Sequence, residues 1–322
     1  MRIRKLGNML AILLAISCIT MSACAKATET TTTSSDEVMS SDTYKDSETV
    51  DTSISESSDE SYQEFEVIDI SDTEKEIYVY RDDLRLYGKI YLPEGDGPFP
   101  VVIYSTGAGA PFSIYIDIVK ELTKNGIAGV CFDFAGNTNP SKSEGDATKC
   151  SALTEAADLE AVLGNITTLD YLDSNNVFLW GHSMGGFVSA YVGCENPDTI
   201  RGMMLAEPSF QIHDEFRTMF PEGTEIPEVV FEPLFAGRPF FEDVLSFDIY
   251  EMLPCYSNNV LIFAGTEVPS IGAEEFEYLD RANSTFPSSE LIAIEGADHN
   301  FTGESRAYMI ELMVEFVTNN IL

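Results

Sequence analysis

The chain has 322 residues, of which 44% are hydrophobic, and its formal net charge is -36 at pH 7. This length and hydrophobic content suffice for one large α/β domain with appended segments. No stretch is basic enough to neutralise phosphates, which argues against nucleic acid as a partner, and the acidity would repel anionic surfaces.

Residues 1–24 predict a targeting segment. Basic residues stand at its start, and an apolar run over 9–19 follows that is too short for a comfortable membrane span. The sequence Met-Ser-Ala-Cys that ends at Cys24 resembles the lipobox of bacterial lipoproteins, in which the cysteine is lipidated and becomes the mature N-terminus. An ordinary signal peptide cleaved just after this point is the alternative.

Residues 25–62 are rich in Ser, Thr, Asp and Glu and contain almost nothing apolar. Such a segment cannot bury enough surface to offset the entropy of ordering it, so it predicts a disordered, self-repelling tether. Together with a lipid on Cys24, the tether would hold a folded domain over 63–322 away from the membrane. The expected location is therefore extracytoplasmic, as a lipoprotein of a bacterial cell membrane.

Strands and helices are expected to alternate through most of the domain. Strands are predicted at 76–80, 84–92, 101–104, 128–134, 177–180, 202–206, 260–264 and 291–294, and helices at 114–124, 153–163, 187–192, 273–283 and 306–317. The first two strands form an antiparallel pair. The later strands are short and wholly apolar, as buried parallel strands are. The alternation predicts an α/β fold with a mainly parallel, doubly wound sheet.

Residues 207–257 fit no repeat of strand and helix and are rich in Phe, Pro and Glu. An insertion above the carboxyl ends of the strands is a natural lid. Its aromatic residues either line an apolar pocket or pack the lid against the body; they are Phe210, Phe216, Phe220, Phe231, Phe235, Phe240 and Phe241.

The motif around Ser183 is the strongest signal in the chain. Gly-His-Ser-Met-Gly follows an apolar strand and opens a helix, which is the context of a nucleophile elbow. The turn is so tight that Ser183 adopts a strained backbone, while Gly181 and Gly185 let the strand and the helix approach closely. The Ser183 hydroxyl then stands at the carboxyl end of the sheet, beside the backbone N–H of Met184.

With these motifs placed, residues 85–322 resemble the α/β-hydrolase superfamily, and within it the bacterial cinnamoyl/feruloyl-esterase-like serine hydrolases with a small inserted lid. The resemblance rests on Val101-Val102-Ile103 before Gly107, Asp133-Phe134-x-Gly136, the Gly181–Gly186 elbow, Asp248-Ile249-Tyr250 before 260–262, and Gly296-Ala297-Asp298-His299. It implies a serine hydrolase that acts on carboxylic esters through an acyl-enzyme. The expected partner is a small-molecule ester substrate, and no cofactor or metal is expected.

A serine hydroxyl becomes a strong nucleophile only when a base takes its proton. Of the three histidines, His299 lies where the superfamily places its base, whereas His182 lies inside the elbow and His213 in the lid. A carboxylate must also orient the base, and the sequence leaves two candidates for it. The family's Asp position holds Val268, so Glu267, one residue earlier, is the first candidate and Glu207 is the alternative.

Two N–H donors are needed for the oxyanion of the tetrahedral intermediate. Met184 supplies one by the geometry of the elbow. The resemblance implies that the loop after the strand at 101–104 supplies the other, which points to Ala108. The family carries His-Gly in this loop, and here Thr106 replaces the His.

The function that the sequence predicts is a secreted, lipid-anchored serine esterase, and the resemblance implies aromatic, feruloyl-type esters as substrates. A lipase, a thioesterase, a peptidase and an acyltransferase stay open, as does a non-catalytic binding protein on a hydrolase scaffold. The four cysteines of the domain fit no zinc pattern, and an exported domain can form a disulfide whose pairing the sequence leaves open; they are Cys131, Cys150, Cys194 and Cys255.

Overall fold

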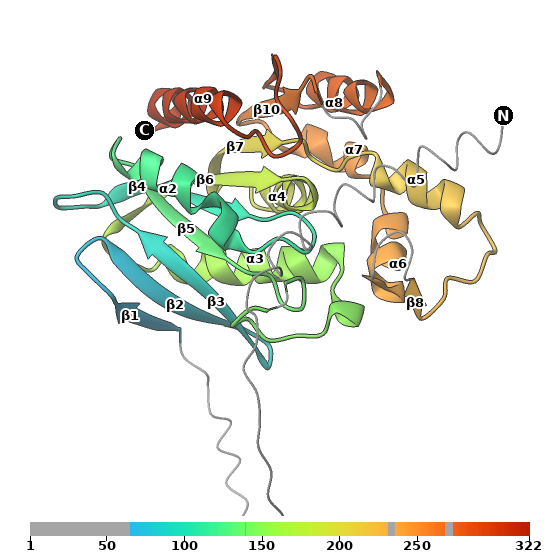
Figure 1. Ribbon diagram of the computed structural model, residues 1–322, viewed down its shortest axis with the longest axis horizontal. Helices are drawn as coiled ribbons and strands as arrows, with labels where there is room; N and C mark the ends of the chain where they lie inside the picture. The colour runs from blue at the N-terminus through green and yellow to red at the C-terminus, as the bar shows by residue number, and fades with distance from the viewer. Residues whose placement is uncertain (1–64, 139, 231–235, 268–272) are drawn as a thin grey trace, which may run out of the picture.

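The computed structural model describes residues 65–138, 140–230, 236–267 and 273–322, without the side chains of 273–275. Across these residues a nine-stranded sheet has the order β1-β2-β3-β5-β4-β6-β7-β10-β11 (Figure 1). Its strands are β1 (Glu66–Asp69), β2 (Glu74–Arg81), β3 (Leu84–Tyr91), β4 (Phe99–Ser105), β5 (Ala128–Phe132), β6 (Leu172–His182), β7 (Ile200–Ala206), β10 (Asn259–Gly265) and β11 (Ser289–Ile294).

Six neighbouring strands of this sheet, β5, β4, β6, β7, β10 and β11, are parallel to one another. They confirm the predicted doubly wound sheet. Every residue of β5 is buried, and so are the last five of β4 and the last seven of β6. Helices cover both faces of these strands, so the strands read as continuous apolar runs rather than as alternating patterns. All their carboxyl ends lie at one edge of the sheet.

The N-terminal end of the sheet is antiparallel: β1 pairs with β2, β2 with β3 and β3 with β5. The pair of β2 and β3 was predicted, whereas β1 was not. All four residues of β1 are exposed, so this edge strand has no alternation of buried and exposed side chains to indicate it.

Two layers of helices sandwich the sheet. On one face, α2 and α9 pack with a core cluster that includes Tyr104, Tyr115 and Trp180. The other face carries α3, α4 and α8. These helices are α2 (Ile116–Thr123), α3 (Ala152–Ile166), α4 (Met184–Glu195), α8 (Ala273–Thr285) and α9 (Glu304–Asn320). All five are predicted from the sequence, with ends that differ by a few residues.

The insertion after β7 holds short helices and a two-stranded sheet. They are α5 (Ile212–Met219), β8 (Val229–Val230), β9 (Ala236–Gly237), α6 (Arg238–Ser246), α7 (Ile249–Met252) and the 3-10 turn η3 (Leu253–Cys255). Figure 1 shows α5, β8 and α6 beside the body. Among these elements, α6 packs on α3, while α7 and η3 pack on α4 and α8. From residue 249 the insertion therefore lies along the helical layer of the body, before the predicted end of the lid at 257.

The lid aromatics pack mainly against one another. Phe216, Phe240 and Phe241 are buried, with ring centroids 4.7–5.7 Å apart, and Phe220 lies 5.2 Å from Phe241. Phe210 is also buried, with its ring 6.0 Å from Tyr250. These contacts favour packing over the lining of a pocket for the described aromatics, although most of the packing is within the lid rather than against the body. Phe231 and Phe235 lie outside the described residues.

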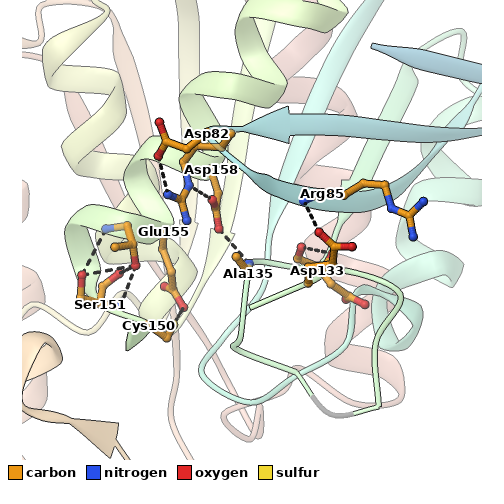
Figure 2. A network of polar contacts seen from close by, with 12 residues as sticks. Asp82, Arg85, Asp133, Ala135, Cys150, Ser151, Glu155 and Asp158 are labelled. Atoms are coloured by element: carbon orange, nitrogen blue, oxygen red, sulfur yellow. Dashed lines mark hydrogen bonds and ion pairs between the residues drawn. The ribbon is translucent and has the colours of Figure 1, made fainter. Parts of the chain in front are cut away.

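A buried polar network fixes the start of α3 beneath this insertion (Figure 2). Asp158 pairs with Arg81 and accepts a hydrogen bond from the Ala135 backbone N–H at 2.8 Å. One turn earlier, Glu155 accepts from the Cys150 thiol at 3.3 Å. Burial raises the pKa of Glu155 to about 8, although the bond from Cys150 acts in the opposite direction. Glu155 is therefore mostly protonated at neutral pH.

All four cysteines of the described domain are free thiols. Cys131 and Cys194 are buried, as the sequence indicates, and so is Cys150, while Cys255 is exposed. Burial raises the pKa of Cys131, Cys150 and Cys194, so these thiols stay protonated at neutral pH.

Candidate active site

Ser183 stands at the turn between β6 and α4, as predicted. Its backbone has φ 54° and ψ -119°, a left-handed conformation that is strained in a residue with a side chain. A Cβ at Gly181 would clash with the carbonyl of Gly185, and one at Gly185 would clash with that of Ser105. The glycines therefore permit the strand–helix contact that the elbow needs. Met184 is the first residue of α4, directly after Ser183.

The loop after β4 lies directly against the elbow. A Cβ placed on Gly107 would be 3.2 Å from the Ser183 Cβ and 3.4 Å from the His182 Nδ1. Ala108, the predicted second donor, follows at once in this loop. Thr106, which replaces the family's His, is fully buried, and its hydroxyl has no hydrogen-bond partner within the described chain. Thr106 thus packs in the loop without bracing it through hydrogen bonds.

Bracing comes instead from the loop after β5. The Asn137 side chain accepts from the Gly109 N–H at 2.7 Å and donates to the Gly107 carbonyl at 3.2 Å. The Thr138 hydroxyl donates to the Ala110 carbonyl at 3.0 Å. These two side chains hold the backbone on both sides of Ala108. The sequence analysis missed this role, because Asn137 lies 28 residues from Gly109 and only the fold brings them together.

The bracing loop is itself anchored to β3 (Figure 2). Asp133 accepts from the Phe112 N–H at 2.8 Å and from the Ser141 hydroxyl at 2.7 Å. Farther along, Glu144 accepts from the Arg85 N–H at 3.0 Å through its side chain and donates to the Arg85 carbonyl at 2.8 Å through its backbone. Both ends of the loop are therefore tied to the sheet, and Asn137 is held in place.

His299 lies on the loop between β11 and α9, at the same edge of the sheet. Asp298 shapes this loop by accepting from the backbones of Asn300 and Thr302, and from the Thr302 hydroxyl at 2.7 Å. Burial lowers the pKa of His299 to about 4, while the charge of Asp298 acts in the opposite direction. The ring Nδ1 is buried and has no hydrogen-bond partner within the described chain.

The other histidines have separate places. His182 is buried, with its ring centroid 4.7 Å from that of His299. Burial lowers the pKa of His182 to about 3, with the neighbouring His299 as a second cause. His213 lies on α5 in the lid, where its Nδ1 is 3.6 Å from a carboxylate oxygen of Asp214.

The two candidate acids differ in burial. Glu207, directly after β7, is 1% exposed, has a left-handed φ of 46°, and accepts a hydrogen bond from the Gly265 N–H. Glu267 has an exposed side chain, and its backbone N–H donates to the Ala297 carbonyl at 2.9 Å. Val268 lies outside the described residues.

Glu207 also lies close to the base loop. A Cβ on Gly265, which donates to the Glu207 carboxylate, would be 2.5 Å from the Ala297 carbonyl and 3.1 Å from that of Asp298. The backbone of Gly265 therefore lies between the Glu207 carboxylate and the two residues that precede His299. Strained left-handed residues cluster at functional sites, and both Ser183 and Glu207 adopt this conformation.

The hydroxyl of Ser183 lies 3.4 Å from that of Ser209, and within the described chain no hydrogen bond joins it to His299. Such bonds are often long before substrate binds. The structure thus brings Ser183, Met184, Gly107–Ala108, His299 and Glu207 to one edge of the sheet. In the described part of the chain, no group of three or more metal-binding side chains occurs, and no helix is long and apolar enough to span a membrane.

The chain is similar in sequence to known hydrolases. Residues 96–238 match the family model described as serine aminopeptidase, S33. Human monoglyceride lipase is 24% identical over 242 residues, which cover 72% of this chain and 75% of that protein.

Solved structures share the fold. Est1E from Butyrivibrio proteoclasticus with bound ferulic acid has a TM-score of 0.68 at 18% identity, over 76% of this chain and 98% of that one. A monoacylglycerol lipase from Paleococcus ferrophilus has a TM-score of 0.56 at 16% identity, over 74% of this chain and all of that one. The chain therefore has the α/β-hydrolase fold and is a serine hydrolase, and its fold resembles that of a feruloyl esterase-like protein.

Proposed function

We propose that the chain hydrolyses carboxylic esters with Ser183 as nucleophile and His299 as base. The observation that carries this proposal is the left-handed backbone of Ser183 at the start of α4, with the Gly107 loop packed against its side chain. Strained backbone of this kind is typical of functional sites, and here it presents the Ser183 hydroxyl to the carbonyl of a substrate.

The proposed reaction has two stages, acylation and deacylation of Ser183. The Ser183 Oγ attacks the ester carbonyl carbon while His299 takes the hydroxyl proton. The Met184 and Ala108 N–H groups donate to the oxyanion that forms. When the intermediate collapses, the C–O bond to the alcohol breaks and His299 returns the proton to the leaving oxygen. A water molecule then attacks the acyl-enzyme by the same route and releases the acid.

Glu207 is the carboxylate that we favour as the partner of His299, ahead of Glu267. A catalytic acid of this kind is buried, so that its charge acts on the imidazolium through a medium of low dielectric constant. Glu207 meets this requirement, whereas the charge of Glu267 is in solvent and screened.

The acyl group that we propose is apolar or aromatic, of the feruloyl type. This proposal is supported by the likeness to Est1E, whose structure holds ferulic acid. Human monoglyceride lipase, a relative by sequence, favours a fatty acyl group as the second candidate. A panel of methyl ferulate, p-nitrophenyl acetate and a monoacylglycerol distinguishes the two classes by kcat/KM.

The test of the proposal as a whole is labelling by a fluorophosphonate, which reacts with activated serines. The full-length chain is expected to gain a single adduct by intact mass, located on the peptide that contains Ser183. Absence of an adduct on well-folded protein would contradict the proposal, whatever ester is tried.

The pH dependence of turnover should reflect the lowered pKa of His299, about 4. The base acts only when neutral, so kcat/KM should stay level down to about pH 5 and fall about tenfold per pH unit below pH 4. The measurement is the initial rate at low substrate concentration between pH 3 and pH 8. An acid limb near the ordinary histidine pKa of about 6.5 would contradict this prediction.

Folded protein must be monitored in the same buffers. The pKa values of His182 and His299 lie below those of the unfolded chain, so the unfolded state binds more protons as the pH falls below about 6.5. Stability therefore decreases in this window. Circular dichroism at each pH distinguishes loss of the base from unfolding.

We also propose that the chain is exported and anchored by a lipid on Cys24, with residues 25–62 as the tether. The support is the sequence pattern alone, and this segment lies outside the described residues.

Expressed in a bacterium with lipoprotein processing, the parent chain is expected in the detergent phase of a phase-separation assay. The Cys24→Ala chain is expected in the aqueous phase or as uncleaved precursor, because no thiol is present to accept the lipid. Equal partitioning of both mature chains would leave the ordinary signal peptide as the better explanation.

A further inference from the structure

The ring of His182 bridges two loops that serve the proposed reaction. Its Nδ1 lies 2.7 Å from the Tyr115 hydroxyl, and its Nε2 lies 2.6 Å from the backbone oxygen of His299. Tyr115 belongs to the 3-10 turn Phe112–Tyr115, which continues the loop that carries Ala108. The bridge therefore joins the oxyanion loop, the elbow and the base loop through one side chain.

These contacts determine the protonation of the bridge. A carbonyl oxygen only accepts, so the His182 Nε2 carries the hydrogen and donates it to His299. A neutral imidazole then has an unprotonated Nδ1, which accepts the hydrogen of the Tyr115 hydroxyl. Burial keeps both groups neutral, because it lowers the pKa of His182 and raises that of Tyr115.

The base loop is held from its outer side as well. Arg306 donates to the carbonyls of Phe301 and Asn300 at 3.0 Å and 2.9 Å, and it pairs with Asp117 on α2 at 2.9 Å. The carbonyl of His299 itself is bonded to His182 from the inner side. The backbone on which the base stands is thus fixed to the segment that follows the oxyanion loop.

We propose that Tyr115 is a positioning residue for the base: its hydroxyl selects the His182 tautomer that holds the His299 carbonyl and so sets the place of the His299 ring. The proposal rests on the proposed function of His299. Without the Tyr115 hydroxyl, the other tautomer of His182 becomes competitive. In that tautomer a lone pair of the His182 Nε2 faces the His299 carbonyl oxygen, so the hydrogen bond between these two groups is lost.

The structure supplies a matched pair of variants. Tyr115 and Tyr104 are both buried and both contact Trp180, with ring centroids 5.0 Å and 5.3 Å away. The Tyr104 hydroxyl, however, has no hydrogen-bond partner within the described chain. Tyr115→Phe and Tyr104→Phe therefore remove the same atom from the same cluster, and only the first removes a bond to the bridge.

The experiment measures the rate of fluorophosphonate labelling, kcat and KM for the full-length parent and both variants. Tyr115→Phe is expected to lower the labelling rate and kcat by at least about tenfold, since small misplacements of a catalytic group have effects of this size or larger. KM should stay within about twofold. Tyr104→Phe should match the parent within about twofold in all three.

A spectroscopic readout tests the bridge directly. In protein labelled with ¹⁵N-histidine, the His182 ring at neutral pH should show a protonated Nε2 and an unprotonated Nδ1. In Tyr115→Phe, the two tautomers should mix, while Tyr104→Phe keeps the parental signals. The chain has only three histidines, so His182→Gln and His213→Gln assign the spectrum.

Each outcome decides a different point. If the parent is labelled and Tyr115→Phe is labelled at the parental rate, the positioning role is wrong and the proposed function stands. A protonated Nδ1 on His182 in the parent also overturns the role. If the parent itself is not labelled, the proposed function fails, and the positioning role fails with it.

Discussion

Replacing Ser183 with alanine is expected to abolish ester hydrolysis, with a loss in kcat on the order of 10⁶-fold, as for other serine hydrolases that lose their nucleophile. The reason is chemical, because the acyl-enzyme forms on the Ser183 Oγ and alanine has no oxygen at that position. The variant should also gain no mass with a fluorophosphonate. Residual turnover then reflects only the oxyanion donors and substrate binding.

The matched control is Ser189→Ala on the same helix. Ser189 is fully buried, and its hydroxyl has no hydrogen-bond partner within the described chain. The Ser189→Ala variant should therefore keep the kcat and the labelling rate of the parent. Substantial turnover by Ser183→Ala would contradict the assignment and direct attention to Ser209, whose hydroxyl lies 3.4 Å from that of Ser183. The double variant with Ser209→Ala would then test this second hydroxyl.

Ser183 and its surroundings were predictable because the elbow is local. Strand, tight turn and helix follow one another within about fifteen residues, and each has its own sequence signal. The parallel strands were predictable for a similar reason, since each is a short apolar run. In contrast, β1 is exposed over its whole length and gave no signal.

The support of the site was not predictable because it is distant in sequence. Asn137 holds Gly109 from 28 residues away, and His182 holds the His299 carbonyl from 117 residues away. An asparagine or a histidine in a loop is equally compatible with solvent and with such a contact. The lid aromatics illustrate the same limit, because composition predicts their burial but does not identify the surface that buries them.

The choice between Glu207 and Glu267 was also beyond the sequence. Both follow a strand of the sheet, and both lie between Ser183 and His299 in the chain, as the order of the triad requires. Their difference is burial, which depends on how the ends of β7 and β10 pack. The sequence ranked Glu267 first through the family pattern, and the geometry gives reasons to reverse that order.

Glu207→Gln is accordingly expected to lower kcat by roughly 10²- to 10⁴-fold, in the range seen when the acid of a triad loses its charge. The glutamine keeps the shape of the side chain and an oxygen that accepts from the Gly265 N–H, so the fold should persist. What is lost is the negative charge that stabilises the imidazolium of His299 in the transition state. Glu267→Gln should stay within about threefold of the parent, because its charge is screened by solvent.

The two substitutions are chemically identical, so their contrast isolates the position of the carboxylate. Labelling by a fluorophosphonate should slow in Glu207→Gln and stay parental in Glu267→Gln, since both labelling and acylation need His299 as base. Thermal melting of both variants provides the check on folding. If the large loss occurs in Glu267→Gln instead, Glu267 is the acid that acts on His299, and Glu207 serves only to hold Gly265. If neither variant loses activity, the buried Nδ1 of His299 takes its partner from another residue, and the acid of this hydrolase is neither of the two glutamates.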